Sequence, residues 1–213
     1  KLYFQANDGV HGIELWVSDG TTAGTSMVRD IWPGTSTRNG DPKYCKAMGN
    51  KIYFQAQNGT VGKELFVSDG TAAGTSLVKD INSASGSQPE MFGGPVNNRL
   101  YFRANDGSGV GDELWATDGT PSGTSLVSDV DPSGNGYPNY MLAGPDNKVY
   151  FQVKINNVFH IYETNGSASG TRQVPGTRSG SGRVVAYDGA YTLYIGDNYN
   201  DFDGGLMKIC SYH

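Results

Sequence analysis

The segment ELWVSDGTTAGT at residues 14–25 decides the fold, because it recurs along the chain. Close copies read ELFVSDGTAAGT at residues 64–75 and ELWATDGTPSGT at residues 113–124, and a more distant copy reads HIYETNGSASGT at residues 160–171. The first half of each copy has the apolar and aromatic residues typical of a strand. The second half favours a tight loop, because an Asp or Asn side chain accepts backbone N–H bonds two residues on. The sequence therefore predicts repeated strand–loop units.

A second strand pattern, centred on a tyrosine, precedes each copy. These tyrosines follow one another at steps of 50, 48, 49 and 44 residues. They are Tyr3, Tyr53, Tyr101, Tyr150 and Tyr194. The first pattern, KLYFQA at residues 1–6, leads into Asn7-Asp8-Gly9, which is typical of a hairpin turn. The fifth, TLYIG at residues 192–196, is degenerate. We therefore expect a hairpin in each unit and a fifth, incomplete unit.

Two further short strands complete each unit. A third strand is predicted at residues 26–31, 76–81 and 125–130, and a fourth segment at residues 44–48, 91–94, 140–144 and 184–187. Four short strands in about 49 residues match the period of a β-propeller blade. The alternatives are a β-solenoid, which has shorter rungs, and a stack of β-sandwiches. We predict an all-β propeller of four-stranded antiparallel blades.

The repeats predict one domain over residues 1–213, with repeats at about 1–50, 51–98, 99–147, 148–190 and a partial one at 191–213. If the segment before each tyrosine strand is innermost, the chain opens at the second strand of one blade and ends after the third strand of a fifth. Two alternatives remain open at this point. The chain forms about five blades, with both ends sharing the closure, or it is a slice of a larger propeller.

The repeated phrase resembles the ELWxxDGT repeat family. Residues 14–25 and 113–124 carry the pattern best, residue 66 has Phe in place of Trp, and the fourth copy departs further with His160, Ile161 and Asn165. The resemblance covers about residues 1–175 and is specific, because a dozen positions match in three copies. It implies a secreted, propeller-like surface protein, and it implies no particular reaction.

Charge and composition exclude some classes of function. The formal net charge is −5, and no cluster of Lys and Arg is present, so nucleic acid is not expected as a partner. No apolar run is long enough to span a membrane. The chain shows no signal peptide and no initiator Met, and it begins in a strand pattern, which indicates a processed or truncated product. We expect an extracellular or cell-surface protein.

Covalent modifications typical of secreted proteins are predicted at four residues. Cys45 and Cys210 are the only cysteines, and we expect them to form a disulfide, with two buried free thiols as the alternative. Asn58-Gly59-Thr60 and Asn165-Gly166-Ser167 are sequons for N-glycosylation. Such triplets also arise by chance in a chain rich in Asn, Gly and Thr.

Aromatic residues recur at one position of the repeat, namely Trp16, Phe66, Trp115 and Tyr162. They predict packing between neighbouring blades, with a ring of ligand-stacking platforms as the alternative. Packing is favoured because the fifth copy has Met207 there, which fills space well but stacks poorly on a sugar.

Recurring acidic residues raise the question of calcium. Asp8, Glu14, Asp106 and Glu113 lie in or near Gly-rich loops, and oxygen-rich loops suit Ca²⁺. The alternative is hydrogen bonding within the turns, because the spacing lacks the dense acidic pattern of strong calcium loops. Cofactors are therefore predicted as none or Ca²⁺.

No motif in the sequence predicts a reaction. The chain has three histidines and lacks a nucleophile elbow, a metal-binding His pair and a CxxC motif. We therefore expect a structural or assembly protein that self-assembles or binds other extracellular proteins. The alternative is a carbohydrate-binding module, and a hydrolase with a single site is the third candidate. Polar and aromatic loop residues would bind the glycan: Tyr137, Asn139, Tyr140, Tyr199, Asn200 and Asp201.

Overall fold

The computed structural model describes residues 1–144, 146–175, 177, 184–187, 192–195 and 207–210. These residues form strands, turns and loops and no helix. None of them forms a helix that is long and apolar enough to cross a membrane. Tyr199, Asn200 and Asp201 lie outside the described residues.

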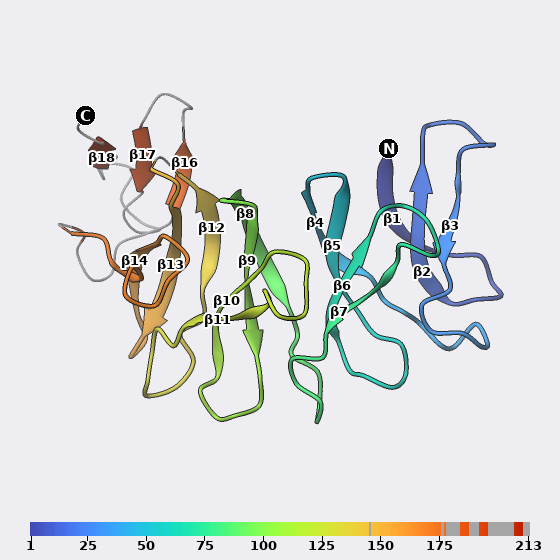
Figure 1. Ribbon diagram of the computed structural model, residues 1–213, viewed down its shortest axis with the longest axis horizontal. Helices are drawn as coiled ribbons and strands as arrows, with labels where there is room; N and C mark the ends of the chain where they lie inside the picture. The colour runs from blue at the N-terminus through green and yellow to red at the C-terminus, as the bar shows by residue number, and fades with distance from the viewer. Residues whose placement is uncertain (145, 176, 178–183, 188–191, 196–206, 211–213) are drawn as a thin grey trace.

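The strands form five antiparallel sheets, which we call the first to fifth blades (Figure 1). The first blade has β1 (Leu2–Asn7), β2 (Ile13–Ser18) and β3 (Ser26–Arg29). The second has β4 (Lys43–Met48), β5 (Lys51–Ala56), β6 (Glu64–Ser68) and β7 (Ser76–Lys79). The third has β8 (Glu90–Val96), β9 (Arg99–Asn105), β10 (Asp112–Thr117) and β11 (Ser125–Ser128). The fourth has β12 (Asn139–Ala143), β13 (Val149–Ile155), β14 (Val158–Thr164) and β15 (Arg172–Gln173). The fifth has β16 (Val184–Tyr187), β17 (Thr192–Ile195) and β18 (Met207–Cys210).

The order of the strands confirms the predicted fold class and the predicted phase of the repeat. Within each sheet, strands pair with their neighbours in sequence, as in a propeller blade. Each of the second to fifth blades opens with the strand that precedes the tyrosine strand, so these four sheets span a boundary between sequence repeats, whereas the first sheet begins at the tyrosine strand. These opening strands, β4, β8, β12 and β16, contact one another along the chain and are the innermost strands.

The blades follow one another in an arc (Figure 1). The first blade lies at one end of the molecule and the fifth at the other, with the second to fourth blades between them. Each blade packs on the next one in sequence, the first on the second through a shared apolar cluster and the later blades through contacts between their strands. This arrangement gives every inner blade one face toward the preceding blade, here called its back face, and one toward the following blade, its front face.

The hydrophobic core lies between the blades. The interface of the second and third blades joins Tyr53, Leu65 and Val67 on a front face to Leu100, Phe102 and Trp115 on a back face. Because side chains alternate along a strand, the two faces of a blade draw on alternate residues. Phe66 and Trp115 are 3% and 6% exposed within these interfaces, which confirms the predicted packing role at this position.

The loop after each second long strand has the predicted hydrogen bonds. In the second blade, Asp69 Oδ1 accepts hydrogen bonds from the N–H and the hydroxyl of Thr71 at 2.9 and 2.7 Å. The Thr71 hydroxyl accepts the N–H of Gly74 at 3.0 Å. A β-carbon at Gly74 would lie 2.1 Å from Asp69 Oδ1, so the loop requires glycine there. Equivalent bonds recur in the first, third and fourth blades.

Candidate functional site

Exposed apolar side chains occupy one equivalent position on three innermost strands. Tyr44, Met91 and Tyr140, which we call the mouth cluster, are 48%, 39% and 44% exposed. Each follows the first residue of its strand, where the pairing with the neighbouring strand shifts register at a β-bulge. The φ angles of these three residues are 56°, 58° and 51°, in a region that non-glycine residues rarely adopt. Such strain costs about 1–3 kcal/mol per residue and is often kept at binding sites.

An arginine links the third and fourth blades beside this cluster. Arg103 forms an ion pair with Glu90 and donates to Asn139 Oδ1 at 3.1 Å. Its guanidinium also lies 5.8 Å from the centre of the Tyr137 ring. The structure therefore brings together Tyr137, Asn139 and Tyr140, the described part of the predicted glycan-binding set. Sequence reasoning missed Tyr44 and Met91, because neither has a glycine or another turn residue to mark the bulge.

The recurring glutamates lie inside the protein and hold the connections between blades. Glu113 is fully buried and accepts hydrogen bonds from the N–H groups of Val130 and Gly136, each at 2.7 Å. Glu14 accepts from Ile31 and Gly40 at 2.9 and 2.8 Å. Burial raises the pKa of Glu113 to about 7, although the two amide hydrogen bonds act in the opposite direction.

These contacts bear directly on the predicted calcium site. The N–H groups that face Glu14 and Glu113 carry partial positive charge, and both oxygens of each carboxyl group accept hydrogen bonds from them. Asp8 accepts the N–H of Val10 at 2.8 Å and pairs with His11 Nδ1 at 2.6 Å, while Asp106 accepts the N–H of Ser108 at 2.9 Å. In the part of the chain that the structure describes, no three acidic, His or Cys side chains gather to hold a metal ion.

Three of the residues predicted to carry modifications, Cys45, Asn58 and Asn165, have described side chains that are exposed or half-buried. Cys45, on β4, is exposed and forms no disulfide in the described structure, while the side chain of Cys210 lies outside the described residues. Their pairing therefore stays a prediction. Asn165 is exposed, and Asn58 is half-buried with Oδ1 accepting the N–H groups of Thr60 and Val61 at 3.0 and 3.1 Å. Glycosylation at the two asparagines also stays a prediction.

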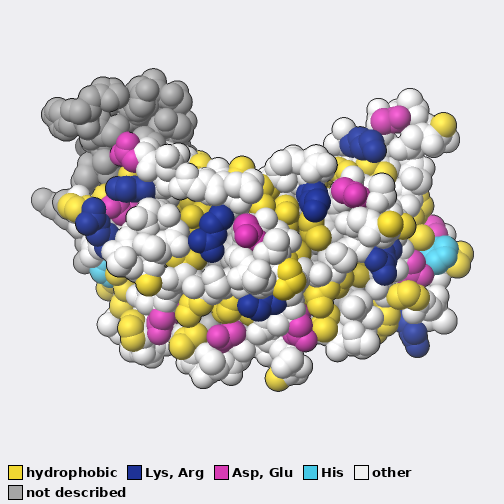
Figure 2. All heavy atoms as spheres, in the orientation of Figure 1, with side chains coloured by type: hydrophobic (Ala, Val, Ile, Leu, Met, Phe, Trp, Pro, Cys, Tyr) yellow, Lys and Arg dark blue, Asp and Glu magenta, His cyan; other side chains and the backbone are white. Residues whose placement is uncertain are grey.

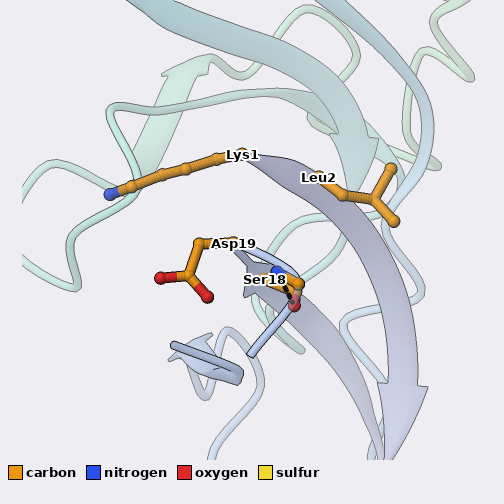
Figure 3. Close-up of a pocket in the computed structure, with 5 residues that line it drawn as sticks. Lys1, Leu2, Ser18 and Asp19 are labelled. Atoms are coloured by element: carbon orange, nitrogen blue, oxygen red, sulfur yellow. Dashed lines mark hydrogen bonds between the residues drawn. The ribbon is translucent and has the colours of Figure 1, made fainter. Parts of the chain in front are cut away.

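The back face of the first blade is open to solvent. Leu2 is 66% exposed, whereas the equivalent Ile52 and Leu100 are 8% and 0% exposed. Phe4 and Trp16 are half-buried, whereas Phe102 and Trp115 are buried. At the rim of this face, Lys1, Leu2, Ser18, Asp19 and Gly20 line a hollow of about 300 Å³ (Figure 3).

Charges on the surface are scattered. Figure 2 shows Lys, Arg, Asp and Glu side chains interspersed over the arc on the face in view, with apolar side chains exposed between them. No large area of one sign appears on that face.

Comparison with known proteins identifies the fold and no family. The sequence matches no family model and no curated protein. A prolyl endopeptidase structure is similar over 97% of this chain, with 11% identity and a TM-score of 0.53. A nidogen–laminin complex and a gluconolactonase from Xanthomonas campestris match over 92% and 91% of the chain, with identities of 10% and 14% and TM-scores of 0.49.

These three similarities extend over parts of the other chains, namely 32% of the prolyl endopeptidase, 69% of the chain in the nidogen–laminin complex and 65% of the gluconolactonase. At such low identity the similarity shows only the fold. Together with the observed order of strands, it identifies the chain as β-propeller-like.

Proposed function

We propose that the chain is an extracellular scaffold that builds larger assemblies through the faces of its blades, and that it catalyses no reaction. The observation that carries this proposal is the way the blades pack on one another. The front face of one blade covers the back face of the next through buried apolar side chains. Such packing suits a scaffold, because apolar surface gains free energy when it leaves water.

The use of the recurring polar groups supports the same proposal. Glu14, Glu64 and Glu113 accept backbone N–H bonds inside the protein, and the Asp or Asn of each loop holds its own turn. The repeated motif therefore stabilises the blades. The resemblance to a family of secreted repeat proteins gives the expected location.

The test is the mass of the protein in solution. Sedimentation velocity over a wide range of concentrations is expected to show association that increases with concentration, and electron microscopy is expected to show rings or filaments. A monodisperse monomer at high concentration would contradict the proposal.

A second candidate function is glycan binding at the mouth cluster. It is favoured by the exposed rings of Tyr44 and Tyr140, held at strained backbone positions beside the polar groups of Arg103 and Asn139. Tyrosine rings offer flat apolar surfaces on which sugars stack, and the polar groups would bind hydroxyls. The test is a glycan array with wild type and a Tyr44→Ala, Tyr140→Ala double variant.

The control is Phe159→Ala, which removes an exposed ring outside the cluster. Glycans bound by wild type and by the control, and lost in the double variant, would support the candidate. An array without any bound glycan would exclude it.

A further inference from the structure

A small pocket lies in the interface between the first and second blades. Its volume is about 120 Å³. The first blade and the segment that follows it contribute Arg29 and Ile31, and the second blade contributes Asn58, Phe66, Thr75, Ser76 and Leu77. Ile31, Phe66 and Leu77 belong to the apolar cluster that joins the two blades. The pocket therefore lies on the covered side of the first blade, away from its open back face.

The exchange of one aromatic residue leaves space at this interface. Phe66 and Trp115 hold the same strand position, since Phe66 pairs with Phe54 as Trp115 pairs with Phe102. The indole of Trp115 is 6% exposed and packs between the second and third blades. The smaller ring of Phe66 fills less of the equivalent space, although protein interiors rarely keep voids larger than a water molecule. The pocket thus marks a place where one repeat departs from the next.

Arg29 supplies the charge of the pocket. Its Nη1 donates to the backbone oxygens of Thr75 and Ala72, the latter at 3.4 Å. A guanidinium has five N–H donors in one plane, so the edge formed by Nε and Nη2 keeps donors for a ligand. Such an edge matches the two oxygens of a carboxylate. Lys79 replaces arginine at the next interface, where it donates to the backbone oxygen of Thr124 at 2.7 Å, and its ammonium group has no such edge.

The other lining groups complement this edge. Asn58 Oδ1 accepts the N–H groups of Thr60 and Val61, so Nδ2 is the group that this side chain offers to a ligand. Ile31 and Phe66 are 6% and 3% exposed and form an apolar wall. The described lining residues include one cation and no acid. This combination suits an anion that carries an apolar tail.

The volume of the pocket limits the size of this anion. A water molecule takes up about 30 Å³ of the liquid, so the pocket holds about four waters or an organic molecule of about five to seven non-hydrogen atoms. Nucleotides and disaccharides are too large. A short aliphatic carboxylate has the right size, charge and polarity.

We propose that the pocket binds a short-chain organic acid as its carboxylate. The Nε–Nη2 edge of Arg29 holds the carboxylate, and the aliphatic tail packs against Ile31 and Phe66. This binding site is distinct from the mouth cluster, and the inference does not depend on the proposed scaffold function.

The test is a titration with sodium butyrate, followed by calorimetry or by the NMR signals of the ligand. Protein from a bacterial host is used, so that Asn58 carries no glycan. We expect a dissociation constant of about 1 mM or tighter for a ligand of this size. Butyramide, which has the same tail without the charge, and inorganic phosphate, which has charge without a tail, are both expected to bind more weakly by about tenfold or more.

Two variants that copy the neighbouring repeat test the location. Phe66→Trp introduces the residue found at position 115 and fills the pocket, while Arg29→Lys introduces the residue found at position 79 and removes the guanidinium edge. Both are expected to keep the melting temperature of wild type within a few degrees, because the third blade packs with these residues. Each should weaken butyrate binding by about tenfold or more. Lys79→Arg is the control and should bind butyrate like wild type.

Four outcomes would overturn the inference. Wild type that binds no butyrate well above the expected dissociation constant has no such site. Binding of butyramide or phosphate as tight as that of butyrate would mean that the carboxylate with its tail is not recognised. Unchanged binding by a folded Phe66→Trp or Arg29→Lys variant would place the anion elsewhere, and weaker binding by Lys79→Arg would place it at the next interface. Sedimentation reports on the scaffold function separately, so none of these results decides it.

Discussion

A buried carboxyl group makes the stability of this protein depend on pH. Burial raises the pKa of Glu113 from 4.5 to about 7, so the folded state holds this proton more tightly than the unfolded state. The stabilising contribution is complete below pH 4.5 and is lost as pH rises toward 7. Burial also raises the pKa of Glu14 and the pKa of Glu64. We therefore predict that the melting temperature falls between slightly acidic and slightly alkaline pH.

The measurement is a series of thermal melts of wild type and Glu113→Gln. The variant cannot titrate at this position, so its melting temperature should change less over the same pH range. It should also be less stable at acidic pH by about 1–3 kcal/mol, because one amide N–H of Val130 or Gly136 loses its acceptor. Asp80→Asn, at an exposed position, is the control and should keep the wild-type profile. Parallel profiles for wild type and Glu113→Gln would contradict the assignment.

A loop glycine gives a second prediction at the scale of single residues. Gly74→Ala places a methyl group 2.1 Å from Asp69 Oδ1, so the turn has to open and Asp69 loses its bonds to Thr71. We expect a loss of about 1–3 kcal/mol in the free energy of unfolding, measured by urea denaturation. Gly134→Ala is the control, since a β-carbon there meets no atom within 4 Å. Equal stability of the two variants would show that the loop tolerates a side chain.

At the scale of strands and blades, burial depends on whether a neighbour is present. Phe102 of the third blade is fully buried, and its equivalent Phe4 of the first blade is half-buried. Phe102→Ala should therefore cost about 3–5 kcal/mol, and Phe4→Ala less than about half of that. Urea denaturation measures the loss in the free energy of unfolding for both variants. It is carried out at a protein concentration low enough to prevent association. Equal losses would mean that the first blade is covered in solution.

The connections between blades give a prediction about calcium. Glu14 and Glu113 face N–H donors that hold the segment entering the next blade. Removal of calcium should leave these bonds intact, so the melting temperature should be the same with a chelator and with added Ca²⁺. A rise on adding Ca²⁺ would place a calcium site elsewhere in the chain.

Local pattern was sufficient to predict the elements but not their environments. Strands, tight loops and the phase of the blades follow from periodicity and turn residues, which act over a few neighbouring positions. Trp16 and Trp115 lie in nearly the same phrase, yet their exposure differs because the neighbouring blade differs. The strained backbone at Tyr44 was also missed, since the bulge depends on pairing with β5 and no glycine marks it. Burial and backbone strain therefore depend on neighbouring strands and blades, which the local pattern does not specify.

At the scale of the whole molecule, the arc should be least stable at its open end. In a repeat protein, each unit is stabilised mainly by its neighbours, and the first blade has a covered front face but an open back face. In a dilute monomer, backbone amides of β1 and β2 should therefore exchange with solvent faster than the equivalent amides of β5, β6, β9 and β10.

Hydrogen exchange followed by mass spectrometry measures this gradient. The amides of β9 and β10 serve as the internal control, since these strands have a neighbouring blade on both faces. Exchange of β1 and β2 at the same rate as β9 and β10 would contradict the gradient.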